Sequence, residues 1–367
     1  MIELRFKKDK IHYNTRKADI YNKPFNIAIG PREPGKSTAI LTKIYKMFIH
    51  HKRPSIILKR MTVEITESDI EDTFKVINKF LDDNKKIKPI FKTSDIKNGF
   101  CDVYISKEDK EKSRVFIRYL SLSVPITRQK GKFLENVAFI YQDECLINPL
   151  MNEKYLPGEF DKIKEIYNTY QRENRAHHTM LKCWFTGNPY TKFSPVFIGL
   201  GIPINKMTSG AFLVGETWTF EAVTLSEELK EDILKNNPLY KFDDSYTRYA
   251  FDGSSIADER YIIEPQQPLN FGLKYVFRIS NRYLLVWRNK NLNEGLNRWW
   301  CSVQDEEPEA NRNIYAIDFN NLISNTRLIT PDVKFIMMRF KSAVATRGIT
   351  YQSIECGYYI EQLYNLI

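Results

Sequence analysis

The sequence predicts an α/β fold with a mostly parallel central sheet, followed by a smaller α+β module. The first sign is an apolar run, Phe25–Ile29, that leads into a glycine-containing turn and then into a segment with apolar residues at helical spacing, 38–50. Two later apolar runs, 136–141 and 181–186, have the length and composition of buried strands, and each ends in polar residues. Strands that alternate with helices in this way are typical of a parallel sheet.

The turn after the first strand matches the phosphate-loop pattern G-x-x-x-x-G-K-[ST] over Gly30–Ser37. The strand before it and the helix after it are the context this motif needs, because backbone N–H groups and the helix N-terminus then point at phosphate oxygens. We expect Lys36 to reach the outer phosphates of ATP and Ser37 to hold Mg²⁺. Pro34 departs from an ordinary loop, since it has no N–H to donate. The candidate nucleotide-binding residues here are Gly30, Pro31, Arg32, Glu33, Pro34, Gly35, Lys36, Ser37 and Thr38.

The segments after the first helix continue the alternation. A buried strand is predicted over 55–60, which puts Arg60 at its carboxyl end, where ligands of open α/β sheets gather. An amphipathic helix is predicted over 67–83 and a β-hairpin over 84–120. Three lysines at the charged tip of that hairpin are candidate DNA contacts: Lys107, Lys110 and Lys112.

Two adjacent carboxylates, Asp143 and Glu144, end the apolar strand that begins near residue 136. In a parallel sheet that also carries the phosphate loop, Asp143 would hold the magnesium through water and Glu144 would be the general base that polarises the attacking water. The alternative is a strand that ends in an exposed acidic turn. The phosphate loop upstream favours the functional interpretation.

Polar residues also surround the strand at 181–186. Asn188, which follows it, is a candidate sensor of the γ-phosphate, with Thr186 as second choice, although Asn-Pro is also a plain turn signal. A helix is predicted over 161–175, and it ends in Arg172 and Arg175. These arginines are candidate fingers for a neighbouring subunit's site. The alternative, favoured by spacing alone, is that they pair with glutamates on the surface.

The pattern changes near residue 268, after a turn-rich stretch that contains two prolines. We predict an ATPase domain over 1–225, a linker subdomain over 226–268 with a helix at 227–235, and a C-terminal domain over 269–367. The last domain should contain strands at 275–279, 282–287, 298–303 and 313–317, a short helix at 319–322, a further element at 333–343 and a terminal helix near 352–366. Its Tyr, Trp and Arg residues suit stacking on nucleic acid, although core aromatics are the commoner explanation.

The composition is that of an ordinary globular protein with a basic charge. The 367 residues are 43% hydrophobic and carry a net charge of +10, which suits a polyanionic partner or simply solubility. The five cysteines are widely spaced, so we expect neither a zinc site nor a disulfide framework. No apolar run is long enough to span a membrane. We therefore expect a soluble, intracellular protein without a membrane partner.

These motifs together resemble the DNA-packaging ATPases of small protein-primed tailed phages, of the phi-twenty-nine type. The resemblance rests on the phosphate loop with Arg32 in its third position, on Asp143-Glu144 and on the run to Asn188. Shorter similarities follow in the same order along most of the chain: 57–60 with Glu64, 120–124, 172–175, 188–190, 285–287, 313–315 and 328–330.

The resemblance implies a fold, an activity and partners. The fold would be a phosphate-loop ATPase of the additional-strand catalytic-glutamate (ASCE) class, with a C-terminal RNase H-like domain that has lost its nuclease acids. The activity would be ATP hydrolysis that drives double-stranded DNA into a procapsid. The protein would form a ring, usually a pentamer, in the host cytoplasm and dock transiently on the viral portal. A structural RNA at the portal, a partner of the best-known relative, is an open alternative.

The resemblance also implies roles for individual residues. The family's phosphate loop falls on Gly30, Gly35, Lys36 and Ser37, and its loop arginine falls on Arg32. Its magnesium aspartate falls on Asp143, its catalytic glutamate on Glu144 and its trans-acting arginine on Arg172, with Arg175 as the alternative. A basic residue upstream of Asp143 aligns with Lys130 or Arg128. The departures from the family pattern are Pro34 and Gln142.

Other functions are weighed against this one. A terminase-like large subunit with its own nuclease would need several converging carboxylates in the last domain. The segment 275–279 carries none, so no nuclease activity is expected. A nucleotide-dependent switch without translocation, or a phosphotransferase, would share the phosphate loop, but the glutamate beside Asp143 favours a hydrolase.

Overall fold

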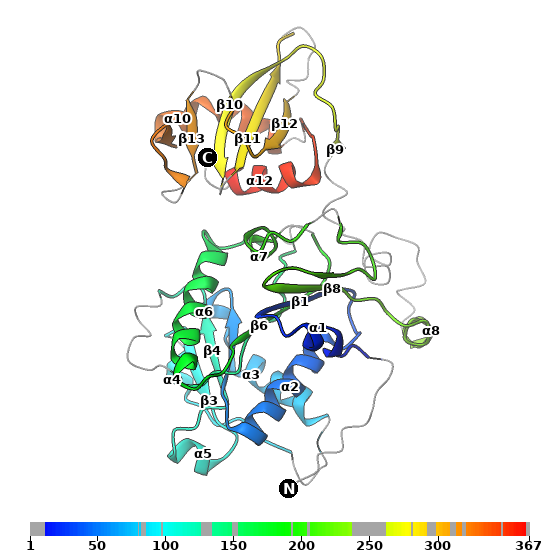
Figure 1. Cartoon of the computed structure of the whole chain (residues 1–367), viewed down its shortest axis with the longest axis vertical. Helices are drawn as coiled ribbons and strands as arrows, with labels where there is room; N and C mark the ends of the chain where they lie inside the picture. Colours follow the sequence, from blue (N-terminus) through cyan, green and yellow to red (C-terminus); the bar gives the residue numbers. More distant parts are fainter. Residues whose placement is uncertain are drawn as a thin grey trace. The chain divides into compact units, whose positions relative to one another are not determined.

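The structure is a computed structural model of the chain. It describes residues 12–79, 81, 86–96, 98–125, 134–148, 153–191, 194–203, 206–236, 262–279, 282–291, 299–308, 313–317, 321–345 and 348–364. The chain divides into two compact units, Met1–Ala257 and Asp258–Ile367, and Figure 1 shows both. Most of the predicted linker at 226–268 lies outside the described residues.

An eight-stranded sheet forms the centre of the first unit, in the order β3-β4-β2-β5-β6-β1-β8-β7. The six strands from β4 to β8 in this order are parallel, and only the edge strands β3 and β7 run antiparallel to their neighbours. The mostly parallel sheet predicted from the sequence is thus confirmed. Its strands are β1 (Phe25–Ile29), β2 (Ser55–Lys59), β3 (Phe100–Val103), β4 (Ile117–Ser121), β5 (Phe139–Gln142), β6 (Lys182–Gly187), β7 (Phe212–Val214) and β8 (Trp218–Ala222).

Strand β6 lies between β1, which leads into the phosphate loop, and β5, which ends at Asp143. An extra strand at this place defines the additional-strand class of phosphate-loop ATPase folds. Because the strands are parallel, the loops after β1, β5 and β6 all emerge at the same edge of the sheet. We call this the carboxyl edge; it is where the predicted site residues gather.

Helices cover both faces of this sheet (Figure 1). Helices α2 and α3 pack on one face through a core that contains Ile40, Phe48 and Phe74. Helices α6 and α7 pack on the other face through Ile163 and Phe197. The helices of this unit are α1 (Arg16–Tyr21), α2 (Lys36–His51), α3 (Glu67–Asn78), α4 (Thr93–Ile96), α5 (Lys107–Glu111), α6 (Glu159–Ala176), α7 (Pro195–Gly199) and α8 (Glu227–Asn236), with a 3₁₀ turn η1 (Thr62–Glu64).

The predicted hairpin is present, and it extends the central sheet. Its strands β3 and β4 pair antiparallel, and β4 also pairs in parallel with β2. The buried guanidinium of Arg118 on β4 bonds both carboxylate oxygens of Asp102 on β3, at 2.6 and 2.8 Å. The charged tip is the short helix α5, where Lys112 pairs with Glu108 at 2.8 Å.

The second unit contains a seven-stranded sheet in the order β14-β13-β10-β11-β12-β15-β9. Strands β10, β11 and β12 are antiparallel, and β13 and β14 continue in parallel beside β10. This order is that of RNase H-like domains, as the resemblance implied. The strands are β9 (Ile262–Ile263), β10 (Phe271–Ile279), β11 (Arg282–Asn289), β12 (Trp299–Gln304), β13 (Ile314–Ala316), β14 (Thr326–Leu328) and β15 (Ile349–Tyr351).

The described residues of the second unit also form three helices: α10 (Pro331–Ile336), α11 (Met338–Ala345) and α12 (Ile354–Tyr364). The terminal helix is therefore confirmed, whereas the first half of the helix predicted at 319–322 lies outside the described residues. Strand β10 carries no acidic residue. Within the described ranges of either unit, no three His, Cys, Asp or Glu side chains are grouped so that they could hold a metal ion.

Two general expectations can be compared with the structure. All five cysteines are buried, and none forms a disulfide in the structure. In the part of the chain that the structure describes, no helix combines the length and apolarity needed to cross a membrane.

Phe116 is the residue whose truncation should most clearly weaken the first unit. It is fully buried just before β4, and its ring lies 5.1 to 6.2 Å from the rings of Phe48, Phe74 and Tyr45. Phe116→Ala should lower the free energy of unfolding by about 3–5 kcal/mol, because it leaves a cavity among these rings. Urea denaturation measures this change. Phe335→Ala, at a residue that is 75% exposed, is the control and should change stability by less than about 0.5 kcal/mol.

Candidate nucleotide-binding and hydrolysis site

The phosphate loop begins where the end of β1 is held from both sides. The N–H of Gly30 donates to the carbonyl of Gly187 at 3.2 Å, and the N–H of Val223 donates to the carbonyl of Ile29 at 2.7 Å. A Cβ added at Gly30 would come within 2.3 Å of the Val223 carbonyl oxygen. Only glycine fits this position without a shift of the main chain.

The loop itself is shaped by Pro34 and its neighbours. Glu33 has φ = 74° and Gly35 has φ = 83°, so residues in the left-handed region stand on both sides of the proline. The Pro34 carbonyl accepts a hydrogen bond from the N–H of Tyr13 at 2.7 Å, and the ring of His12 lies against Gly35. The main chain of Pro34 thus holds the segment before β1 against the loop, but any residue offers this carbonyl, and the proline itself has no structural explanation here.

Lys36, the first residue of α2, points back into the loop. Its Nζ donates to the carbonyl oxygens of Gly30 at 2.8 Å and of Pro31 at 2.5 Å, and its side chain is buried. Burial lowers the pKa of Lys36 to about 8; Asp143 offsets part of this shift. The ammonium therefore occupies the inside of the loop, close to where phosphate oxygens would lie.

Asp143 lies next to Ser37, as the sequence predicted. The Ser37 hydroxyl donates to Asp143 Oδ1 at 3.0 Å, and the Thr186 hydroxyl donates to the same oxygen at 2.6 Å. Since Thr186 has a single hydroxyl proton, the fully buried Tyr141 must be the donor in its 2.8 Å bond to Thr186. A chain of hydroxyls from Tyr141 through Thr186 thus fixes the Asp143 carboxylate.

Glu144 follows Asp143 in a left-handed conformation, with φ = 51°. Its N–H donates to Asp143 Oδ1 at 3.1 Å, and solvent reaches its side chain. The pKa of its carboxyl lies above the ordinary value because partial burial and the neighbouring Asp143 disfavour the charged form; Lys59 and Arg32 offset part of this rise. A carboxylate with a raised pKa, beside a phosphate loop, is suited to accept a proton.

Arg32 and Asn188 lie on the outer side of the loop. The exposed Arg32 donates through Nη2 to the Tyr190 hydroxyl at 2.9 Å, which joins the loop to the segment after β6. The carbonyl of Asn188 accepts from the N–H of Tyr190 at 2.8 Å. Thr38, on α2, is partly buried. The predicted residues from Gly30 to Thr38, Asp143, Glu144 and Asn188 are therefore brought together at the carboxyl edge.

Arg172 and Arg175 lie elsewhere. They are exposed near the end of α6, and Arg172 contacts Glu173 at 3.5 Å, as the surface alternative expected. The same end of α6 is bonded to the beginnings of β5 and β6, through Asn174 to the Val137 carbonyl and through Gln171 to the N–H of Leu181. Strands of this length separate the two edges of the sheet by roughly 15–20 Å. The two arginines therefore cannot reach the phosphate loop of their own chain.

Of three other predicted residues, the structure describes one, Arg60. Arg60 turns away from the phosphate loop and binds Glu159. Arg128 and Lys130, aligned through the resemblance, lie outside the described residues.

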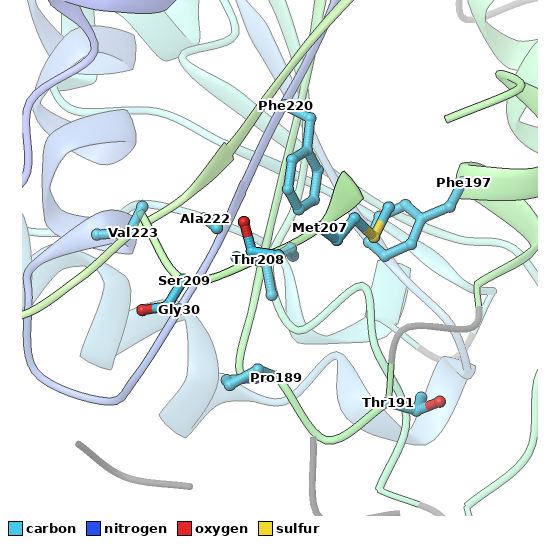
Figure 2. A pocket seen from close by; sticks show the side chains of 11 residues that line it. Gly30, Pro189, Thr191, Phe197, Met207, Thr208, Ser209, Phe220, Ala222 and Val223 are labelled. Carbon is cyan, nitrogen blue, oxygen red and sulfur yellow. The ribbon is translucent and has the colours of Figure 1, made fainter. Parts of the chain in front are cut away.

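A small hollow adjoins the start of the loop (Figure 2). It is lined by Gly30, Pro189, Phe197, Met207, Phe220 and Val223, among others. Its volume of about 40 Å³ is well below the ~150 Å³ of a cavity that can hold a benzene ring. In this conformation the hollow has no room for a nucleobase.

The residues present fit a phosphate group and a magnesium ion. The N-terminus of α2 has no side-chain cap, so N–H groups of its first turn remain available to an anion. The hydroxyl of Ser37 and the carboxylate of Asp143 offer two hard oxygen ligands 3.0 Å apart, and magnesium prefers such ligands.

The comparison with solved structures finds the same architecture in phage packaging motors. The Phi-28 gp11 DNA packaging motor aligns with a TM-score of 0.62 at 14% sequence identity, over 96% of this chain and 97% of that one. The bacteriophage Phi-29 viral genome packaging motor assembly aligns with a TM-score of 0.61 at 17% identity, over 97% and 99%. This chain shares their fold. No family model matches the sequence, and a search of curated proteins finds no match either.

The shared fold covers both units, so it includes the RNase H-like second unit as well as the ATPase fold. The resemblance to phage DNA-packaging ATPases that was stated from the sequence is therefore confirmed for the fold. The identities are low, and the roles of individual residues therefore rest on the geometry of this chain.

Sequence reasoning missed some residues of the site. Tyr141 stands two residues before Asp143, so the alternation of side chains along a strand places both on the face that packs against α2. This spacing could have identified Tyr141 as a neighbour of Asp143 from the sequence. No local sequence pattern indicates a role for Tyr190 or Glu159. Tyr190 contacts Arg32 and Glu159 contacts Arg60, and each contact joins segments about a hundred or more residues apart.

The buried ammonium of Lys36 generates a prediction about pH. The folded-state pKa of about 8 lies below the ordinary 10.5, so the unfolded chain binds more protons between these values and stability rises with pH. Relative to Lys36→Met, the wild type without nucleotide should gain about 2 kcal/mol of unfolding free energy between pH 7 and pH 10. Urea denaturation of both proteins at the two pH values measures this difference. A difference that does not change with pH would contradict the burial of a charged Lys36.

Proposed function

We propose that this chain is the ATPase of a viral DNA-packaging motor, which forms a ring and uses ATP hydrolysis to move double-stranded DNA into a procapsid. The observation that carries the proposal is the contact of Ser37 with Asp143 at 3.0 Å, with Glu144 beside it, on the fold of the Phi-28 and Phi-29 motors. The first of these structures is named for DNA packaging and the second for viral genome packaging.

Each residue of the site would have its own role in ATP hydrolysis. The loop from Gly30 to Thr38 binds the phosphates, and Lys36 exchanges its two carbonyl partners for phosphate oxygens. Ser37 and Asp143 hold Mg²⁺, which when bound neutralises charge on the phosphates. Glu144 orients water and accepts its proton, and Arg32 and Asn188 respond to the γ-phosphate from the outer side of the loop.

The position of Arg172 and Arg175 supports a site that is completed by a neighbouring subunit. Both are exposed at the edge of the sheet opposite to their own phosphate loop. If either arginine stabilises the transition state, it does so at the site of another copy, which a ring provides. Arg172 is our candidate, with Arg175 as the alternative, and a pentamer is the expected assembly.

The net charge of +10 supports a nucleic-acid partner. At the hairpin tip, helix α5 presents exposed lysines, and acidic neighbours on the same helix balance much of their charge. Lys107, Lys110 and Lys112 stay candidate DNA contacts. The motor would dock on a viral portal in the host cytoplasm, with or without a structural RNA.

Glu144→Gln tests the assignment of the general base. The amide keeps the shape of the side chain but cannot accept a proton, so the rate of DNA-stimulated ATP hydrolysis should fall by about 10²–10⁴-fold. Binding of a fluorescent ATP analogue should be retained. Glu71→Gln, at an exposed glutamate on α3, is the control and should leave the rate unchanged. Hydrolysis that survives in Glu144→Gln would refute the assignment.

A mixing experiment tests the arginine finger. Arg172→Ala subunits keep an intact phosphate loop, and Lys36→Ala subunits keep an intact finger. Each alone should lose most hydrolysis, because a finger contributes ~10³–10⁵ in rate. Mixed rings should recover part of the DNA-stimulated rate, since an intact site then meets an intact finger. No recovery at any ratio would rule out Arg172 as a finger in trans, and the same mixture made with Arg175→Ala tests the alternative.

A further inference from the structure

The conformation of Glu144 requires support from its surroundings. It is one of the few residues other than glycine with a positive φ among the described residues, and such a conformation is strained for a residue with a long side chain. Strained backbone persists where neighbouring contacts over-determine it. The contacts that hold this turn are therefore part of what places the Glu144 carboxylate.

Two hydrogen bonds hold the residue after Glu144. The N–H of Cys145 donates to the carbonyl of Thr186 at 2.8 Å, from the side of β6. The carbonyl of Cys145 accepts from Nη2 of Arg60 at 3.2 Å, from the side of β2. The main chain that follows Glu144 is thus fixed between its two neighbouring strands.

Arg60 is itself held by a buried carboxylate. Its Nε donates to both oxygens of Glu159, at 2.9 and 3.1 Å, and its Nη2 donates to one of them at 3.0 Å. The Glu159 side chain is 0% exposed and that of Arg60 is 12% exposed. The ring of Tyr155 lies 5.2 Å from the guanidinium carbon. Several contacts therefore fix the guanidinium in one place.

Glu159 also joins this group to the strand that carries the proposed catalytic pair. One of its oxygens accepts from the N–H of Leu156 at 2.8 Å, just before α6, and the other lies 3.5 Å from Nε2 of Gln142. Gln142 directly precedes Asp143, at a position where the resembling family has an apolar residue. Glu159 thus gives the amide nitrogen of this buried polar residue an acceptor.

We propose that Arg60 is a positioning residue that holds Glu144 in the conformation needed for hydrolysis, with Glu159 as its anchor. The inference rests on the proposed role of Glu144 as general base. Arg60 does not act on the nucleotide; it acts through the Cys145 carbonyl. The planar guanidinium is needed because it bonds a carboxylate and a carbonyl at once, whereas the ammonium of lysine is a point charge without this fork.

The same sheet offers a matched control. Arg118 and Asp102 form a second buried ion pair with two hydrogen bonds, between β4 and β3. This pair makes no contact with Asp143, Glu144 or Cys145 that the structure describes. If Arg60 served stability alone, replacing either arginine by lysine should have the same kind of effect.

The experiment compares Arg60→Lys with Arg118→Lys in the full-length protein. Arg60→Lys should lower kcat for ATP by about 10²-fold, the effect of a misplaced reacting group, with the affinity for a fluorescent ATP analogue unchanged. Arg118→Lys should leave kcat unchanged even if it lowers the melting temperature. Equal loss of kcat in the two variants, or an unchanged kcat in Arg60→Lys, would overturn the inference.

A structural readout separates this inference from the proposed function. In a crystal structure of Arg60→Lys, Glu144 should leave the left-handed region, and an unchanged turn would overturn the inference whether or not the protein hydrolyses ATP. A wild type without hydrolysis would instead refute the proposed function. Should Arg60→Lys fail to fold, Glu159→Gln, which keeps the shape of the anchor, should show the same loss of kcat and the same change at Glu144.

Discussion

The end of strand β6 is the constraint on which the site depends. Its main chain bonds the start of the phosphate loop, through the Gly187 carbonyl and the N–H of Gly30, and also the turn after Asp143, through the Thr186 carbonyl and the N–H of Cys145. The side chain of Thr186 reaches the Asp143 carboxylate as well. The two halves of the site therefore keep their relative position only while β6 stays between β1 and β5. A shift of this strand would move both halves together.

The parts that could be predicted from the sequence are those encoded by local pattern. Strand β1, the phosphate loop and α2 follow from an apolar run, two glycines and helical spacing, and Asp143 and Glu144 follow from the end of a second apolar run. The strand order was available only through the resemblance, because hydrophobic patterns do not state which strands are neighbours. Strands as short as β14, with three residues, carry too little pattern to be found.

The contacts that could not be predicted join segments distant in sequence. Arg60 shows this clearly: its place at a strand end suggested a ligand contact, but its partner is Glu159, 99 residues later. The phosphate loop is a second case, since Tyr13 bonds the carbonyl of Pro34 and His12 lies against Gly35, from a segment about twenty residues earlier. A buried polar group needs a hydrogen-bond partner, because burying it unpaired costs free energy. The sequence does not show which partner lies within reach.

The site without nucleotide combines buried charge with strain. The Lys36 ammonium donates to two carbonyl groups inside the loop, and burial lowers its pKa although Asp143 offsets part of this shift, so its charged form is less stable there than in water. Glu144 is held in a left-handed conformation beside another carboxylate. A folded chain tolerates such costs where the rest of the structure enforces them, as β6 and the Arg60–Glu159 pair do here. Phosphate oxygens would stabilise the Lys36 ammonium more than neutral carbonyls do, because a hydrogen bond to a charged acceptor is stronger.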